Sequence, residues 1–562
     1  MNRKDGKPDL EKPAKPVKLA TYPVFAGMLF VLLVGYADEV RGQVHPHEDH
    51  ALGTVNFPVS SSSKEAQAEF NRAVAFLHHM TYPQAQEAFK QVAKTDPRCA
   101  MAHWGIAMTL FQPLWPTRPG PEALRQGWEE VQKAMALQPA TERERLFVAA
   151  AEAFFLEPQA PNYWLRIRRW EQAMEKVYTA FPEDHEASTF YALAHLATAP
   201  SDTLSRTNSD RAAEILLRVY RQNPDHPGAM HYLIHANDVP GRERESLEIT
   251  HKYELVAPRN PHALHMPTHI YTRLGDWDRV IRGNLRAADA ALEYPTGDHG
   301  QFVWDEFPHA IEYLIYAYLQ KGLDEQASEQ LKRLRGNAHV EPTFKTAFHL
   351  ASTQARYVLE RRAWGDAAQL VPREPASLDW DRFAWPEAIA CFARGLGAAH
   401  LENLKEAQAN SERLDALETA MRKAGEDLFA RNIRILRLEL NAWIAHMGQQ
   451  DTALPLMREA AGLEALTPKH AVTPGPTLPA HELLGDMLLE RKQPAEAIAA
   501  YKRSLELWPR RLNSLLGGAR AARALNQGSV AREFYQELLE VAAEASPRPA
   551  RKEAQTFLAE QR

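Results

Sequence analysis

Two short segments of the sequence carry histidine pairs at the same spacing. His231 and His235 lie in "MHYLIHAND", and His265 and His269 lie in "LHMPTHIYT". Side chains four residues apart share one face of a helix, so the two members of a pair can point at one ligand. Neutral imidazole suits zinc, copper, iron or nickel, and metal sites between facing helices are built from such pairs. The spacing therefore predicts a transition-metal site or a polar binding face.

The two pairs occupy the same place in consecutive copies of one unit. The segments "NPDHPGAMHYLIHAND" and "APRNPHALHMPTHIYT" superpose with a shift of 34 residues, which aligns His231 with His265 and His235 with His269. Neighbouring helices in such an array lie roughly 10 Å apart, so the four imidazoles can converge. A duplicated unit also inherits its residues without any shared role. Three interpretations therefore stay open, namely a metal site, a metal-free binding groove and simple packing.

The next unit extends the same face. Aligning "LQKGLDEQA" with "TRLGDWDRV" on their glycines places Glu312 at the position of His265 and Tyr316 at that of His269, with His309 three residues before Glu312. The predicted metal ligands are His231, His235, His265, His269, His309 and Glu312. The other expected groove residues are Tyr316, Asp238 and Arg273, of which the last two lie near the ends of the histidine helices and are expected to order the groove.

Pro267 lies between His265 and His269. A helix that starts near Pro261 has passed its first turn there, so the missing N–H of Pro267 predicts a lost hydrogen bond and a kink. Local rules are often broken at functional sites, although a kink also serves packing.

The segments that position these residues have the sequence pattern of α-helices. From Glu65 onward, amphipathic segments are broken by short Pro, Gly and Asp signals, with no run of alternating strand residues, which predicts an all-α fold. Three small or aromatic positions recur 34 residues later, namely Gly485 with Ala519, Ala497 with Ala531, and Tyr501 with Tyr535. Small residues where helices cross, with an aromatic ring beside them, are typical of stacked helix pairs.

These residues resemble the tetratricopeptide repeat, whose 34-residue unit is a helix-turn-helix. The chain is also similar to a broad group of exported bacterial proteins with such repeats, on the segments "DPRCAMAHWGIAM" and "HALHMPTHIYTRLGDW". The resemblance implies a right-handed solenoid whose concave groove binds ligands. Carried over to this sequence, that groove would hold His231, His235, His265 and His269.

Composition excludes several classes of function. The chain has 562 residues with 45% hydrophobic and 25% charged residues, and its net charge of -6 gives no reason to expect a nucleic-acid partner. The two cysteines, Cys99 and Cys391, cannot form a disulfide framework and are expected as buried thiols, with one bridge between them as the alternative. No phosphate loop, glycine-rich fingerprint or serine elbow supports nucleotide or serine-hydrolase chemistry.

The amino terminus predicts export. A start rich in lysine and proline precedes the apolar run "YPVFAGMLFVLLVGYA", which is shorter than the roughly 20 residues of a spanning helix. This length favours a cleaved signal, with an uncleaved anchor as the alternative. We expect the rest of the chain in the cell envelope on the periplasmic or extracytoplasmic side, either secreted or anchored in the inner membrane.

The chain divides by composition into five predicted parts. Residues 1–42 are the signal or anchor, 43–64 a histidine-containing tether, 65–465 the main repeat array, 466–545 a terminal repeat pair and 546–562 a polar tail.

The sequence predicts first a binding or scaffold protein whose groove captures a protein or peptide partner in the cell envelope. The alternative is a metalloprotein that holds zinc, copper or iron. Whether it is an enzyme stays open, because catalysis needs an open coordination position and a base, for which Glu312 is the candidate.

Overall fold

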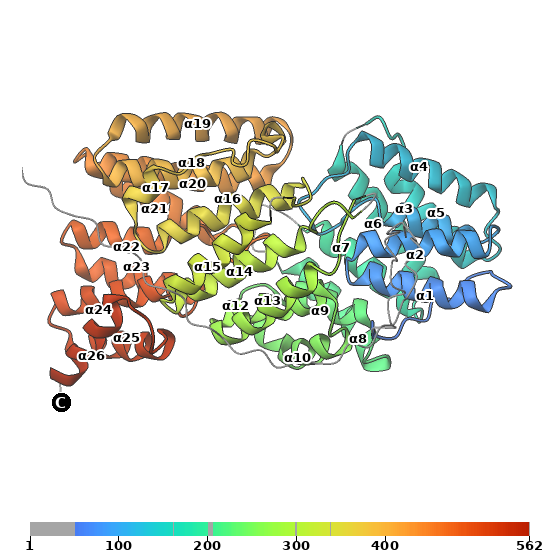
Figure 1. Ribbon diagram of the computed structural model, residues 1–562, viewed down its shortest axis with the longest axis horizontal. Coiled ribbons are helices and arrows are strands. Elements are labelled where there is room, and N and C mark those ends of the chain that lie inside the picture. Colours follow the sequence, from blue (N-terminus) through green and yellow to red (C-terminus); the bar gives the residue numbers. More distant parts are fainter. Residues whose placement is uncertain (1–50, 161, 200–205, 298–299, 338, 561–562) are drawn as a thin grey trace, which may run out of the picture. The chain divides into compact units, whose positions relative to one another are not determined.

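The computed structural model describes residues 51–160, 162–199, 206–297, 300–337 and 339–560 (Figure 1). Within these ranges the regular elements are helices, and the strand-like pairing consists of two isolated β-bridges, Thr296 with Phe302 and Val303 with Val340. The all-α prediction is confirmed. The predicted export segment lies outside the described residues.

The helices follow one another with short connections. Up to the histidine region they are α1 (Lys64–His78), α2 (Tyr82–Thr95), α3 (Ala100–Met108), α4 (Pro121–Ala136), α5 (Glu142–Phe155), α6 (Tyr163–Ala180), α7 (His185–Ala197), α8 (Thr207–Gln222), α9 (Pro227–Asn237), η1 (Glu243–Ser246), α10 (Leu247–Val256), α11 (Pro261–His265), α12 (Pro267–Leu274) and α13 (Trp277–Ala291). Beyond it they are α14 (Glu306–Gln320), α15 (Asp324–Gly336), α16 (Phe344–Leu359), α17 (Trp364–Ala368), η2 (Trp380–Arg382), α18 (Ala384–His400), α19 (Leu404–Lys423), α20 (Asp427–Met447), α21 (Ala453–Ala465), α22 (Ala480–Glu490), α23 (Pro494–Leu507), α24 (Leu512–Ala524), α25 (Gly528–Val541) and α26 (Pro549–Glu560).

Neighbours in the sequence are neighbours in space. Helix α1 packs on α2, α18 on α19, and α24 on α25, as Figure 1 shows. In the carboxyl-terminal pairs, the Tyr501 ring of α23 fills the space left by Gly485 of α22 and Gly517 of α24. A Cβ atom at these glycines would come within 2.7 Å and 2.2 Å of the ring. The small and aromatic positions of the 34-residue repeat therefore form the predicted helix-pair contact, and the fold is a tetratricopeptide-like array.

Two main hydrophobic cores meet near the histidine helices. One core contains side chains from Phe57 to Ile270, and the other contains side chains from Tyr271 to Phe557. The second core runs without a break past the loop 466–479, so residues 466–545 share it with the helices that precede them. This loop connects α21 to α22.

Both ends of the described chain pack against the helices. In the segment 51–64, which belongs to the predicted histidine-containing tether, the Phe57 side chain is fully buried, with its ring 5.2 Å from that of Phe70 and 4.9 Å from that of Phe147. In the predicted polar tail, α26 packs on α25 and places Phe557 5.0 Å from the Tyr535 ring. In both segments a few apolar residues suffice to hold a mostly polar stretch against the core.

Both cysteines are buried and free, so the expectation of buried thiols is confirmed. Among the residues that the structure describes, no helix combines the length and the apolar character needed to cross a membrane.

A half-buried histidine makes the stability of the second core depend on pH. His400 stacks between Trp364 and Trp443, with ring centroids 3.8 Å and 4.3 Å away, and burial lowers its pKa to about 3. The unfolded chain binds a proton at this position below about pH 6.5, whereas the folded chain does so only near pH 3. The folded state should therefore lose about 1.4 kcal/mol per pH unit from this group as the pH falls through that window.

The variant His400→Phe keeps an aromatic ring in the stack and removes the titrating group. Urea unfolding at a series of pH values should give a curve for this variant that is flatter between about pH 6.5 and 3 than the curve of the unchanged protein. Parallel curves would show that His400 is protonated equally in the folded and unfolded states.

Candidate metal centre

The two histidine pairs lie on helices that meet where the cores adjoin. Helix α9 carries His231 and His235. His265 and His269 lie on the helix that takes the same place in the next repeat. The second helix is broken at Pro267, with α11 ending at His265 and α12 starting at Pro267. Met266 keeps helical angles (φ -53°, ψ -41°), so the expected interruption is a missing hydrogen bond within a continuing turn.

Three histidines converge in what we call the His265 triad, formed by His265, His269 and His309 of α14. Their side chains are at most 1% exposed. The Nε2 atoms of His265 and His269 are 3.0 Å apart, and one ring nitrogen from each of the three histidines lies within 4.8 Å of the others.

Partners at the Nδ1 atoms fix which nitrogen of each ring faces the centre. His265 Nδ1–H donates to Asn284 Oδ1 (2.6 Å), whose own amide nitrogen donates to the Val280 carbonyl and so cannot compete. His269 Nδ1–H donates to Asp238 (2.9 Å). Because each Nδ1 carries the proton, each Nε2 presents a lone pair to the other.

His309 is held by a relay of two groups. His349 donates its Nδ1–H to Glu312 (2.5 Å), so its Nε2 accepts the Nδ1–H of His309 (3.0 Å). The Nε2 atom of His309 is buried and has no hydrogen-bond partner among the described residues. Buried polar atoms are nearly always paired, so an unpartnered nitrogen in a cluster with two further imidazoles indicates a cation-binding position.

A second group, the His231 triad, contains His231, His235 and His262 of α11. His231 Nδ1–H donates to the His78 carbonyl (2.6 Å), and His262 Nδ1–H donates to the Glu306 carboxylate (3.1 Å). The Nε2 atom of His231 lies 3.1 Å from those of both His235 and His262. His231 and His262 thus present their Nε2 lone pairs, and His235 places its Nε2 beside that of His231.

The histidines are neutral in this environment. Burial, followed by the neighbouring imidazoles, holds the pKa values of His231, His235, His265 and His309 well below the usual range, and burial lowers the pKa of His269 to about 4. Metal ions bind imidazole in its neutral form. These five rings are therefore deprotonated at neutral pH and ready to act as ligands.

Asp238 joins the centre to two cations. Besides His269, its carboxylate contacts Arg273 (2.8 Å) and Lys469 of the loop 466–479 (2.7 Å). Burial alone would raise the pKa of Asp238, but Lys469, Arg273 and His269 outweigh it and hold the pKa well below its usual value. The carboxylate is thus charged, and it orients His269 as carboxylates do in metal–histidine pairs.

The structure places several of the predicted site residues in surroundings that their repeat positions did not show. His231, His265 and His269 are fully covered and do not line an open groove, and of the four paired histidines only His235 borders the larger cavity described below. Glu312 belongs to neither triad, because His349, Ser352 and Arg356 occupy its carboxylate. Tyr316 accepts a hydrogen bond from Arg511 (2.9 Å), away from the histidines. The alignment placed these residues by repeat position and could not show what packs over them.

Sequence reasoning missed four participants. His262 lies three residues before His265, and Tyr313 lies four residues after His309 with its hydroxyl 3.4 Å from His269 Nε2, so helical spacing would have found both. His349 and Lys469 have no such signal, since they reach the centre from α16 and from a loop about 200 residues after the histidine pairs.

Aromatic rings cover the centre. The Trp115 ring stands edge-on to His262 and His309, at centroid distances of 5.4 Å and 5.5 Å, and the Tyr313 ring lies 4.6 Å from His265. These rings exclude water from the imidazoles on that side.

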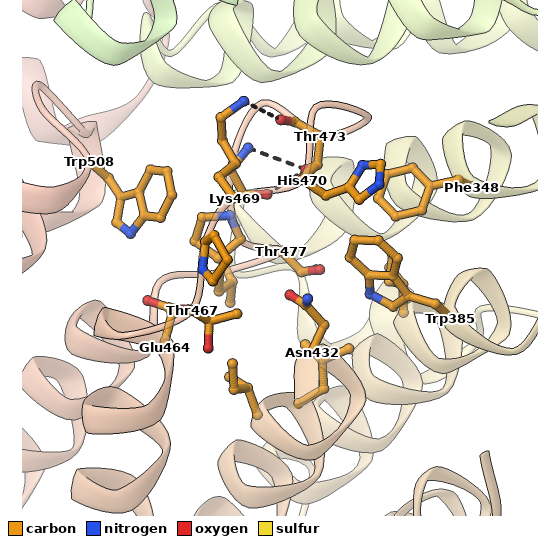
Figure 2. Close-up of a pocket in the computed structure, with 17 residues that line it drawn as sticks. Phe348, Trp385, Asn432, Glu464, Thr467, Lys469, His470, Thr473, Thr477 and Trp508 are labelled. Atoms are coloured by element: carbon orange, nitrogen blue, oxygen red, sulfur yellow. Dashed lines mark hydrogen bonds between the residues drawn. The ribbon is translucent and has the colours of Figure 1, made fainter. Parts of the chain in front are cut away.

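Two cavities flank the loop 466–479. The larger, about 230 Å³, is lined in part by His235, Asp238, Arg273, Lys469 and Trp508, so it reaches the His231 triad. The smaller, about 50 Å³, is also lined by residues of this loop, among them Lys469, Thr473 and Thr477. Figure 2 shows it with Lys469, Thr473 and Thr477 between Trp508 on one side and Trp385 and Phe348 on the other.

A third histidine group is a closed hydrogen-bond network. His226 accepts the backbone N–H of Ala229 at Nδ1, so its Nε2–H donates to Glu186 (3.1 Å). The other oxygen of Glu186 lies 2.7 Å from Nε2 of His78, whose Nδ1 contacts the Tyr232 hydroxyl. Each ring nitrogen of His78 and His226 has a hydrogen-bond partner. These contacts account for the group as a structural link between α1, α7 and α9.

The described residues thus define an all-α array of tetratricopeptide-like helix pairs with two buried histidine triads. Helix-pair arrays in general present extended surfaces for binding other proteins.

Comparison with family models and with curated proteins gave no match. Among solved structures, a chain of the crystal structure of the APC/C hetero-tetramer Cut9-Hcn1 is similar, with a TM-score of 0.33 and 14% identity, covering 88% of this chain and 90% of that chain. A chain of the human IFIT1 dimer with PPP-AAAA has a TM-score of 0.36 and 13% identity, covering 86% of this chain and 96% of that chain.

Proposed function

We propose that this protein binds a transition-metal ion in the His265 triad. The observation that carries the proposal is that one ring nitrogen of each of His265, His269 and His309 lies within 4.8 Å of the others, while His309 Nε2 is buried without a hydrogen-bond partner among the described residues. Three imidazoles without a thiolate or carboxylate suit copper, zinc, nickel or iron(II), and they disfavour magnesium and calcium, which require oxygen ligands.

Packing alone does not account for this arrangement. Two lone pairs at 3.0 Å repel, and the partners at Asn284 and Asp238 prevent either ring from turning its N–H inward. A cation between the nitrogens removes the repulsion and uses all three lone pairs. Three protein ligands leave a fourth position of a tetrahedral ion for the Tyr313 hydroxyl or an external ligand.

Elemental analysis tests the proposal. The full chain, prepared without a histidine tag and washed with a weak chelator, should hold metal that the double variant His265→Ala, His269→Ala loses. The variant His251→Ala, which removes an exposed histidine of α10, is the matched control and should keep the metal. Both carry the same amino-terminal histidines, so that segment cancels in the comparison.

Thermal unfolding gives a second readout. An ion that binds only the folded chain stabilises it by about 2.7 kcal/mol at a free concentration of 100 times Kd, so added metal should raise the Tm of the unchanged protein and not that of the double variant. A chain that contains no metal and shows no Tm shift with copper, zinc, nickel or iron would contradict the proposal.

The sequence-based expectation of a scaffold in the cell envelope is compatible with a metal site. Export through residues 1–42 and a protein partner in the envelope stay predictions of the sequence. The metal site would then belong to the body of the scaffold, apart from any surface that contacts a partner.

A further inference from the structure

The geometry points to a second metal ion in the His231 triad, next to the first and reached from the 230 Å³ cavity at His235. This inference rests on the proposed function and extends it from one ion to a pair of ions with six histidine ligands. Of the two ions, the one in the His231 triad is the one to which small anions from the solvent would bind.

The first argument is that both triads are built by the same rule. Each triad contains two histidines that lie four residues apart in one repeat. Its third histidine lies on the first helix of the next repeat. The third residue directly follows a proline in both cases, His262 after Pro261 and His309 after Pro308, and it lies on the helix that packs beside the pair. In the alignment of the repeats, His309 occupies the position of His262. One step along the array therefore carries the His231 triad onto the His265 triad.

The second argument is the orientation of the rings. The His78 carbonyl takes the Nδ1–H of His231, and the Glu306 carboxylate takes that of His262. Their Nε2 atoms then face each other as lone pairs at 3.1 Å. Glu306 also forms an ion pair with Lys345 of α16. A charged acceptor holds the His262 N–H in place and strengthens the ring as a ligand.

The third argument is the short distance between the triads. The ring centroids of His235 and His269 are 5.8 Å apart, and those of His262 and His265 are 6.2 Å apart. The two triads therefore adjoin, and two ions held by these neighbouring rings lie close enough for their electron spins to interact.

The fourth argument concerns access. His235 is the partly exposed member of the six histidines, and it lines the cavity together with Arg273 and Lys469. Asp238 neutralises one of these two cations, so the wall beside His235 keeps a positive charge. The His265 triad is covered by Tyr313 and Trp115. A small anion or a carboxylate can thus reach the ion in the His231 triad through the cavity.

The experiment loads the full chain with Cu(II) and compares three variants. His262→Gln removes one ligand of the His231 triad, His309→Gln removes one of the His265 triad, and His251→Gln is the control. Elemental analysis should give two ions per chain for the unchanged protein and the control, and one for each triad variant. The far-ultraviolet circular dichroism of each variant verifies that it is folded.

Electron paramagnetic resonance separates a pair of ions from two remote ones. Two Cu(II) ions at this spacing couple, so the signal of the unchanged protein should be much weaker than its copper content. Each triad variant should regain the full signal of one isolated Cu(II). Azide, as a small anionic probe, should change the visible spectrum of His309→Gln, which keeps the ion in the His231 triad, and leave that of His262→Gln unchanged.

The outcomes distinguish the two proposals. One ion in the unchanged protein that His309→Gln loses and His262→Gln keeps would overturn the second site and leave the proposed function standing. No ion at all would overturn both. Two ions with uncoupled signals, or an azide response only in His262→Gln, would overturn the paired and accessible arrangement inferred here.

Discussion

The variant Asp238→Asn is expected to unfold with a free energy lower by about 3–5 kcal/mol than that of the unchanged protein. The substitution keeps the size of the side chain and removes its charge. The Arg273 and Lys469 side chains, which are 7% and 4% exposed, then stay in place without the carboxylate that both contact. Removing one charge from a buried group costs more than the contact itself, because the remaining charges keep their desolvation cost.

The same variant separates stability from metal binding. The new side-chain amide would still accept the N–H of His269, but a neutral amide is a weaker partner than a carboxylate, so metal affinity should fall by about 10–100-fold. Urea unfolding and competition with a chelator measure the two effects. Asp278→Asn is the control, since Asp278 is mostly exposed and pairs with Lys321 at the surface. Equal effects of the two variants would show that the buried position of Asp238 is unimportant.

Replacing Arg511 by methionine is expected to cost about 3–5 kcal/mol of unfolding free energy. Its guanidinium is fully buried, binds Glu482 through two nitrogens (2.9 and 3.1 Å) and contacts Glu360 (2.8 Å) and the Tyr316 hydroxyl (2.9 Å). Without Arg511, Glu360 loses its buried cationic partner, and Arg362 is the cation that still pairs with Glu482. The Arg511 guanidinium, at the start of α24, thus connects Tyr316 of α14, Glu482 of α22 and Glu360, which follows α16. Its loss therefore weakens the contacts of the second core.

The control for this change is Arg503→Met. Arg503 forms an exposed ion pair with Glu506, for which a cost below about 1 kcal/mol is expected. Urea unfolding of both variants measures the difference. A cost for Arg511→Met as small as that for Arg503→Met would mean that water enters the site and screens the remaining carboxylates.

Local patterns were sufficient to predict the helical array and the two histidine pairs. Helical periodicity, glycine and proline breaks and the 34-residue spacing act within one or two helices, so they survive in a single sequence. The contact of Tyr501 with Gly485 shows this, since both belong to one repeat. The His265 and His269 pair was visible for the same reason.

The remaining part of the centre depends on contacts between distant segments. Lys469 reaches Asp238 from a loop more than 200 residues away, and His78 offers a carbonyl from α1 to His231. No periodicity connects such positions. The surroundings of Glu312 were hidden for the same reason, because the alignment fixed only its place in the repeat, whereas Arg356 and His349 of α16 contact its carboxylate.

The shared construction of the two triads also bears on how the sequence arose. A site made from two histidines of one repeat and one of the next is inherited whole when a single repeat is duplicated, and no further ligand has to evolve. Divergence then changes the hydrogen-bond partners of the rings, and these partners already differ between the triads. His265 donates its Nδ1–H to Asn284, whereas His231 donates its Nδ1–H to the His78 carbonyl. A lineage that lost His262 would keep one ancestral site, whereas one that duplicated the repeat again would gain a third.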